Sequence, residues 1–80
     1  MPFFFFVWDG ENDDHVAQHG VTTEEFEEVV MNPENVRPTR GAANRLIAFG
    51  ETSTGKYLGC VYRLFDEATV YPLTAFELRR

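Results

Sequence analysis

The spacing of hydrophobic and polar residues predicts two short helices between Asp9 and Asn32, separated by one glycine. Asp9 can cap the first helix, because its carboxylate can accept hydrogen bonds from first-turn N–H groups that have no partner inside the helix. His19 and Gly20 end this helix, since glycine tolerates the left-handed backbone conformation that commonly follows a helix. The first helix is therefore expected between Asp9 and Gly20.

The second helix begins after Thr22, which is followed three residues later by Glu25. In this capping-box spacing, each side chain can accept a hydrogen bond from the backbone N–H of the other residue. Val21 and Phe26 have the spacing of a hydrophobic staple across the same helix start. Glutamates line the solvent side of the helix, and its apolar face carries Phe26, Val29 and Val30. The helix ends before Asn32-Pro33.

Four runs of apolar and β-branched residues predict strands, over residues 3–8, 45–50, 57–64 and 69–76. The first, from Phe3 to Trp8, is apolar throughout, so we expect it to be covered on both faces or to pair with another chain. The last contains Pro72, which cannot donate to a sheet and therefore predicts a sheet edge or a bulge. Residues 32–44 have no apolar periodicity and are interpreted as a long loop.

The order of these elements, β-α-α-β-β-β, predicts an α+β fold in a single domain that spans residues 1–80. The connections between the last three strands are short and contain turn-forming residues, so these strands are expected to be antiparallel neighbours. We therefore expect a mainly antiparallel four-stranded sheet with both helices packed on one face.

Charge is distributed unevenly along a chain whose formal net charge is −6. Residues 1–36 contain nine acidic residues and no lysine or arginine, whereas residues 37–80 contain all seven basic residues and four acidic ones. The net negative charge argues against general binding to a phosphate backbone, but the second half could present a mildly basic surface. The single cysteine, Cys60, lies in an apolar run and is expected to be a small buried residue rather than a reactive thiol.

No leader sequence and no apolar stretch long enough to cross a membrane is recognisable, so we expect a cytoplasmic protein without a membrane partner. His15 and His19 have the spacing of a metal-binding pair on a helix, but no third ligand accompanies them, and we expect no metal or other cofactor. The two histidines remain candidates for helix capping, for a hydrogen bond to the sheet, or for acid–base chemistry.

The helical segment also resembles a known protein family. The residues concerned are Trp8-Asp9, Asn12, His15, His19-Gly20-Val21, the glutamates that follow and the apolar helix that ends at Asn32-Pro33. This arrangement is similar to the opening of the BrnT family of bacterial toxins, which resemble the RelE-type ribonuclease toxins of type II toxin–antitoxin pairs. The resemblance implies a divergent, C-terminally short member with a RelE-like fold, RNA-cleaving activity that needs no metal ion, and a ribbon-helix-helix antitoxin as partner.

Cleavage of RNA without a metal needs a group that removes the proton of the 2′-hydroxyl, a group that protonates the leaving oxygen, and a fixed cation beside the phosphate. With the residue types available, the catalytic candidates are Arg45, Arg63, Lys56 and His19. Arg63 has the strongest claim, because it interrupts an apolar strand. The candidates for contact with RNA are two loop arginines and three tyrosines that could stack on bases: Arg37, Arg40, Tyr57, Tyr62 and Tyr71.

The chain departs from the family pattern at several positions. Gln18 stands where BrnT-like proteins usually carry a lysine, and Tyr71 and Phe76 stand where their arginines would fall. These differences leave a second hypothesis open, that of a catalytically inactive relative that serves as a binding or regulatory module, for example as a homodimer through residues 3–8. An enzyme of another class is disfavoured, because no nucleophile–base set, phosphate loop or metal motif is present.

Overall fold

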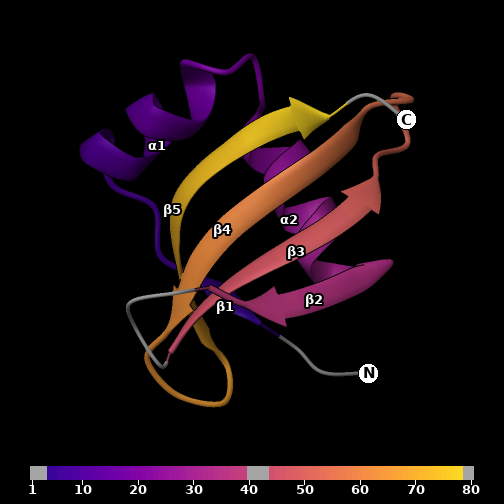
Figure 1. Ribbon diagram of the computed structural model, residues 1–80. Helices are drawn as coiled ribbons and strands as arrows, with labels where there is room; N and C mark the ends of the chain where they lie inside the picture. Colours follow the sequence, from indigo (N-terminus) through magenta and orange to yellow (C-terminus); the bar gives the residue numbers. More distant parts are fainter. Residues whose placement is uncertain (1–3, 40–43, 79–80) are drawn as a thin grey trace.

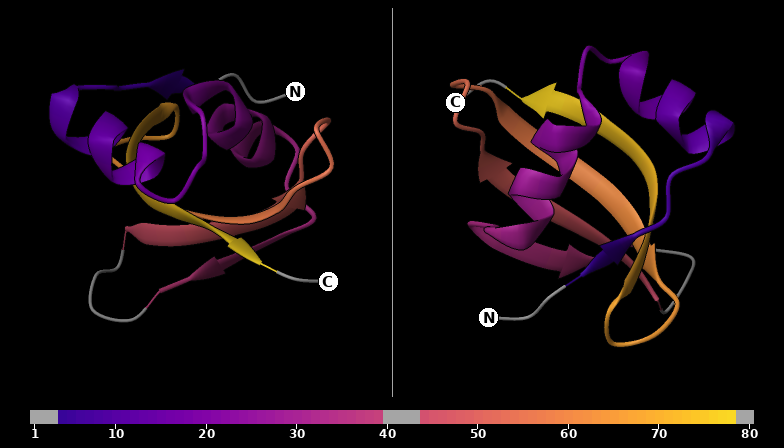
Figure 2. Two further views of the ribbon diagram at one scale, coloured as in Figure 1. Left: turned by 90° about the horizontal axis from the view of Figure 1, so that it is seen from above. Right: turned by 180° about the vertical axis from the view of Figure 1, so that it is seen from behind.

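The computed structural model describes residues 4–39 and 44–78, which form a mixed sheet covered on one face by two helices (Figures 1 and 2). In chain order the elements are β1 (Phe5–Phe6), α1 (Gly10–Ala17), α2 (Thr23–Met31), β2 (Asn35–Pro38), β3 (Arg45–Glu51), β4 (Tyr57–Leu64) and β5 (Thr69–Leu78). The strand order is β1-β5-β4-β3-β2, in which β1 runs parallel to β5 and the other neighbours are antiparallel. The predicted α+β class, with both helices on one face, is confirmed.

The sheet has five strands rather than four, because β2 lies within the segment that was interpreted as a loop. β2 pairs with β3 from Asn35 opposite Phe49 to Pro38 opposite Leu46. All four of its residues are exposed, so the strand has no buried positions from which an alternating pattern could be recognised. The interpretation of residues 32–44 as a loop is therefore wrong for residues 35–38.

The first strand is much shorter than predicted, since only Phe5 and Phe6 pair with β5. The side chains of Phe4, Phe6 and Trp8 pack against the core, whereas Phe5 is 63% exposed. The described part of the chain therefore covers only one face of this strand, so the predicted cover on both faces is wrong there. Pairing with another chain stays a prediction. Phe3 lies outside the described residues.

Both helix starts have the predicted caps. The Asp9 side chain accepts from the backbone N–H groups of Glu11 and Asn12, and the Asn12 side chain accepts from the backbone N–H of Asp9 at 2.8 Å. Thr22 and Glu25 form the predicted capping box. Neither helix of the described chain has the length and apolar character needed to cross a bilayer.

One face of the sheet forms the core with the helices, and the left view of Figure 2 shows both helices on this side. Its buried residues are Val16, Val21, Phe26, Val29, Val30, Ala48, Leu58, Cys60, Tyr62, Val70 and Ala75. Cys60 is completely buried, and burial raises the pKa of its thiol to about 12, so its predicted role as a small core residue is confirmed. Because alternate strand residues point to opposite faces, the intervening residues form a second face that neither helix covers, which we call the open face.

Of the two features predicted for Pro72, the bulge is confirmed, whereas β5 lies between β1 and β4 and is not an edge strand of the sheet. Tyr62 pairs with Pro72 and Val61 pairs with Thr74, so Leu73 is the extra residue of a bulge in β5. Pro72 also lacks the N–H needed to continue the parallel ladder with β1, and the carbonyl of Val7 instead accepts from the Asn12 side chain at 2.8 Å. The parallel pairing therefore stops at Val70, and α1 lies against β5 beyond that point.

Candidate functional site

Two arginines lie directly opposite each other on the open face. Arg45 on β3 pairs in register with Arg63 on β4, and Arg63 pairs on its other side with Tyr71 on β5. Directly opposed residues in an antiparallel sheet have Cβ atoms about 4.5–5.5 Å apart, and like charges at this separation destabilise the sheet. We call Arg45 and Arg63 the arginine pair.

Within the described residues, the arginine pair has no acidic partner. The Nε atoms of Arg45 and Arg63 are both buried and make no hydrogen bond. Neither guanidinium forms a salt bridge with any residue in the described ranges 4–39 and 44–78, whereas Lys56 pairs with Glu25. Two adjacent guanidinium groups can hold an anion such as a phosphate group through charge-assisted hydrogen bonds.

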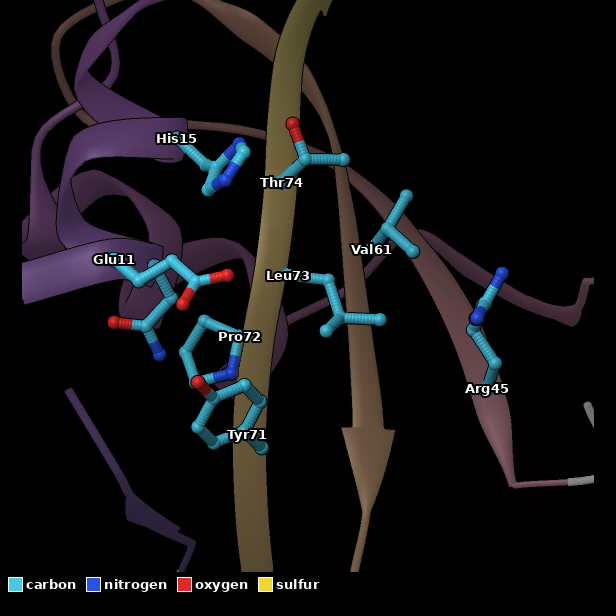
Figure 3. A pocket seen from close by; sticks show the side chains of 9 residues that line it. Glu11, His15, Arg45, Val61, Tyr71, Pro72, Leu73 and Thr74 are labelled. Atoms are coloured by element: carbon cyan, nitrogen blue, oxygen red, sulfur yellow. The ribbon is translucent and has the colours of Figure 1, made fainter. Parts of the chain in front are cut away.

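A pocket of about 330 Å³ extends from Arg45, one member of the arginine pair, across the open face to α1. It is lined by Glu11, Asn12, His15, Arg45, Val61, Tyr71, Pro72, Leu73 and Thr74. Figure 3 shows Glu11 and His15 of α1 at one end and Arg45 of β3 at the other, with β5 and β4 between them. The pocket thus places acidic, imidazole and guanidinium groups around one space.

The bulge and the helix spacing explain how α1 contributes to this pocket. Glu11 and His15 are four residues apart and therefore lie on the same face of α1. The bulge at Leu73 interrupts the alternation of β5, so that both Leu73 and Thr74 line the pocket. Because β1 does not pair with β5 beyond Val70, α1 can lie against this part of β5.

Tyr71 is held at the pocket wall by a hydrogen bond from its hydroxyl to Asp9 Oδ2, with a length of 2.7 Å. This hydrogen bond is the main cause of a raised pKa at Tyr71. The pKa of Asp9 is lowered, chiefly by the backbone N–H of Asn12 and then by the Tyr71 hydroxyl. The raised pKa of Tyr71 and the lowered pKa of Asp9 both favour the tyrosine hydroxyl as donor and the ionised aspartate as acceptor.

The structure places three of the RNA-contact and catalytic candidates close together. These are Arg45, Arg63 and Tyr71, which follow one another across three neighbouring strands. Arg37 lies on the same face, opposite Ile47 on β3. Tyr57 also lies on this face but at its far end, opposite Glu51. Arg40 lies outside the described residues.

Three other candidates lie away from the pocket. Lys56 Nζ donates to the backbone carbonyl of Gly20 at 3.0 Å and to Glu25 Oε1 at 3.3 Å, which joins the sheet to the helices. Tyr62 is 4% exposed on the helix-covered face, and burial raises the pKa of its hydroxyl. His19 is exposed in the turn after α1 and does not line the pocket.

Neither Glu11 nor Thr74 was predicted to belong to the site, and His15 had no single predicted role. The spacing of Glu11 and His15 was a usable signal, because residues four apart share a helix face. Nothing in the sequence indicated that this face of α1 lies beside β5. Among residues 4–39 and 44–78, no three His, Cys, Asp or Glu side chains are grouped so that they could hold a metal ion.

Comparison with known proteins gives one informative match. No protein-family model matches the sequence, and a search of curated proteins finds no match. Among solved structures, the chain is similar to the 1.1 Å crystal structure of the Brucella abortus ribonuclease toxin BrnT, with a TM-score of 0.71 over 100% of both chains and 18% sequence identity. This chain has the BrnT fold. The predicted resemblance is therefore confirmed at the level of the fold, and in this BrnT-like chain the arginine pair lies on the face of the sheet that the helices leave uncovered.

Proposed function

We propose that this protein is a BrnT-like ribonuclease that cleaves RNA without a metal ion, with the scissile phosphate bound by the arginine pair. The observation that carries the proposal is the direct opposition of Arg45 and Arg63 without an acidic partner in the described chain. The description of BrnT as a ribonuclease toxin supports it. Two guanidiniums in a partly desolvated position would stabilise the additional negative charge that develops on the phosphate in the transition state.

The pocket supplies groups for both proton transfers. In the proposed reaction the 2′-oxygen attacks phosphorus, the bond from phosphorus to the 5′-oxygen breaks, and the products are a 2′,3′-cyclic phosphate and a 5′-hydroxyl. Glu11 accepts the proton of the 2′-hydroxyl, and the imidazole of His15 donates one to the 5′-oxygen. The acid and the base lie on one turn of α1, and Arg45 lies on the other side of β5 and β4 from them (Figure 3).

Cleavage of a single-stranded RNA by the purified protein in the presence of EDTA tests this proposal. Arg45→Gln and Arg63→Gln should each reduce the cleavage rate by roughly 100- to 1,000-fold, the usual effect of removing one group that stabilises a charged transition state. Lys56→Met is a cation-removing control, because Lys56 contacts Gly20 and Glu25 rather than the pocket. Intact RNA with the wild-type protein would contradict the proposal and favour the non-catalytic binding module.

The two histidines provide a matched pair of variants on the same helical segment. His15→Gln should reduce cleavage at neutral pH, because His15 lines the pocket. His19→Gln should cleave at the wild-type rate, since His19 lies in the turn beyond α1. Equal cleavage rates for the two variants would show that His15 has no part in the mechanism. The role of the arginine pair would still be decided by its own variants.

The name of BrnT as a toxin also supports a partner protein for this chain. We propose an antitoxin of the ribbon-helix-helix type, which would suppress the growth arrest caused by induced expression of this protein. Co-expression of a small neighbouring reading frame tests this partnership, and continued arrest would exclude that reading frame. A homodimer through residues 3–8 stays a prediction supported by the exposure of Phe5, and sedimentation of the wild type beside Phe5→Lys tests it.

A further inference from the structure

An exposed phenylalanine lies beside the arginine pair and has no role in the core. Phe65 follows β4 directly and is 59% exposed. Its ring stacks on that of Tyr71, with a centroid distance of 5.7 Å and an interplanar angle of 29°. We call these two rings the Phe65–Tyr71 stack.

The surrounding hydrogen bonds hold this exposed ring in place. The backbone N–H of Phe65 donates to the carbonyl of Thr69 at 3.0 Å. Asp66 closes the turn, because its carboxylate accepts from the backbone N–H groups of Ala68 and Thr69 and from the Thr69 hydroxyl. Tyr71 is fixed from the other side by its hydrogen bond to Asp9. The turn therefore presents an aromatic ring to solvent in a defined orientation, which costs little entropy when a ligand binds.

The position of the stack relates it to the proposed phosphate site. Tyr71 is directly opposite Arg63 in the sheet and lines the same pocket as Arg45. Neighbouring strands lie roughly 4.8 Å apart, so the stack begins one strand away from the arginine pair. Asp66 and Glu67 follow Phe65, and their negative charge makes the surroundings of the Phe65 ring unsuitable for a second phosphate. An uncharged aromatic base has the chemistry that fits an exposed ring at this point.

We propose that the Phe65–Tyr71 stack binds the base of a nucleotide next to the phosphate held by the arginine pair, and that Phe65 thereby selects single-stranded RNA. This inference rests on the proposed function. A base can lie against Phe65 only when it is not stacked and paired within a duplex, so duplex RNA is excluded. Stacking uses the face that every base has, so the preference is for unpaired strands rather than for one sequence.

A non-cleavable 2′-O-methyl RNA strand allows binding to be measured separately from catalysis. Phe65→Leu keeps an apolar side chain but removes the aromatic face, and it should weaken binding by roughly 5- to 140-fold, the range expected for one base–aromatic stack. Phe65→Trp should restore binding, because it provides a larger face. Val36→Ala is the positional control, since Val36 is also exposed, at 41%, but lies on the edge strand β2, two strands away from β4.

A strand with a single abasic nucleotide, moved along the sequence, distinguishes stacking from general damage to the fold. When the abasic nucleotide takes the position that stacks on Phe65, the wild type should bind the strand more weakly. Phe65→Leu should bind this abasic strand as well as it binds the complete strand, because it has already lost the stacking contact. Equal affinity of the wild type and Phe65→Leu for every strand, or equal binding of single-stranded and duplex RNA, would overturn the inference. Cleavage that fails while Phe65-dependent binding persists would overturn the proposed catalysis alone.

Discussion

The arginine pair predicts that the removal of one charge will stabilise this protein. Arg63→Met keeps an unbranched apolar stem in place of the arginine stem and deletes the guanidinium. The change relieves the repulsion between directly opposed like charges, which amounts to roughly 0.2–1 kcal/mol. It also removes the buried Nε donor of Arg63, which has no hydrogen-bond partner. Burying an unsatisfied donor costs about 1 kcal/mol at the lower end of the known range, and this lower value applies because Arg63 is only partly buried. The free energy of unfolding should therefore rise by about 1–2 kcal/mol.

Lys56→Met is the matched control, because it is the same kind of substitution at a cation that has partners. The variant loses the hydrogen bonds from Nζ to Gly20 and to the buried carboxylate of Glu25. Hydrogen bonds to charged groups contribute roughly 1.5–3 kcal/mol, and exposure of a third of the lysine side chain reduces this to about 1–2 kcal/mol. The two substitutions should therefore shift the free energy of unfolding in opposite directions.

Thermal unfolding followed by circular dichroism, at neutral pH and low salt without phosphate, measures both effects. A change of 1 kcal/mol corresponds to roughly 4–8 °C in Tm for a domain of this size, so the two variants should differ clearly. Inorganic phosphate at about ten times its Kd should stabilise the wild type by roughly 1.4 kcal/mol and leave Arg63→Met unaffected. A loss of stability in Arg63→Met similar to that in Lys56→Met would mean that the Arg63 guanidinium has a structural partner, and this would refute the anion site.

Three further predictions concern the core and the helix caps. The pKa of Glu25 is lowered below 4.5, chiefly by a hydrogen bond from a backbone N–H at the start of α2. The ionised carboxylate therefore contributes stability above pH 4.5, and this contribution is lost as the pH falls through the lowered pKa. Glu25→Gln should show a smaller decrease in Tm between about pH 5 and pH 3 than the wild type. The Cys60 thiol should not react with a thiol reagent at pH 8 in the folded protein and should react fully in denaturant, because it is buried with a pKa of about 12; rapid reaction without denaturant would contradict its burial. Gly59→Ala should lower Tm by several degrees, since the new Cβ would lie 2.7 Å from the tip of the Phe76 ring. Gly10→Ala is the control and should leave Tm unchanged, because its Cβ would meet nothing within 4 Å. Equal Tm values for the two variants would show that the Phe76 ring moves away without loss of packing.

The helices and the central strands were predictable because their signals are local. Asp9 and Thr22 bond to residues within three positions of themselves, so the sequence alone contains both partners of each cap. The mostly apolar run of residues 57–64 matches β4 at both ends. Pro72 predicted a local irregularity in β5, because the absence of its N–H does not depend on the rest of the fold.

The site could not be predicted in the same way, because its residues come from four elements and are joined by strand register. Arg45 and Arg63 face each other only because β3 and β4 pair in one particular register, and a shift by one residue would move either side chain to the opposite face. Lys56 was an equally good candidate by residue type, yet the tertiary structure directs it to Glu25. The sequence by itself determined the caps, the long strands and the α+β class, since these follow from interactions between near neighbours. The tertiary structure decided which charges are neutralised and which remain available, because a charge acquires its partner only when distant segments pack together.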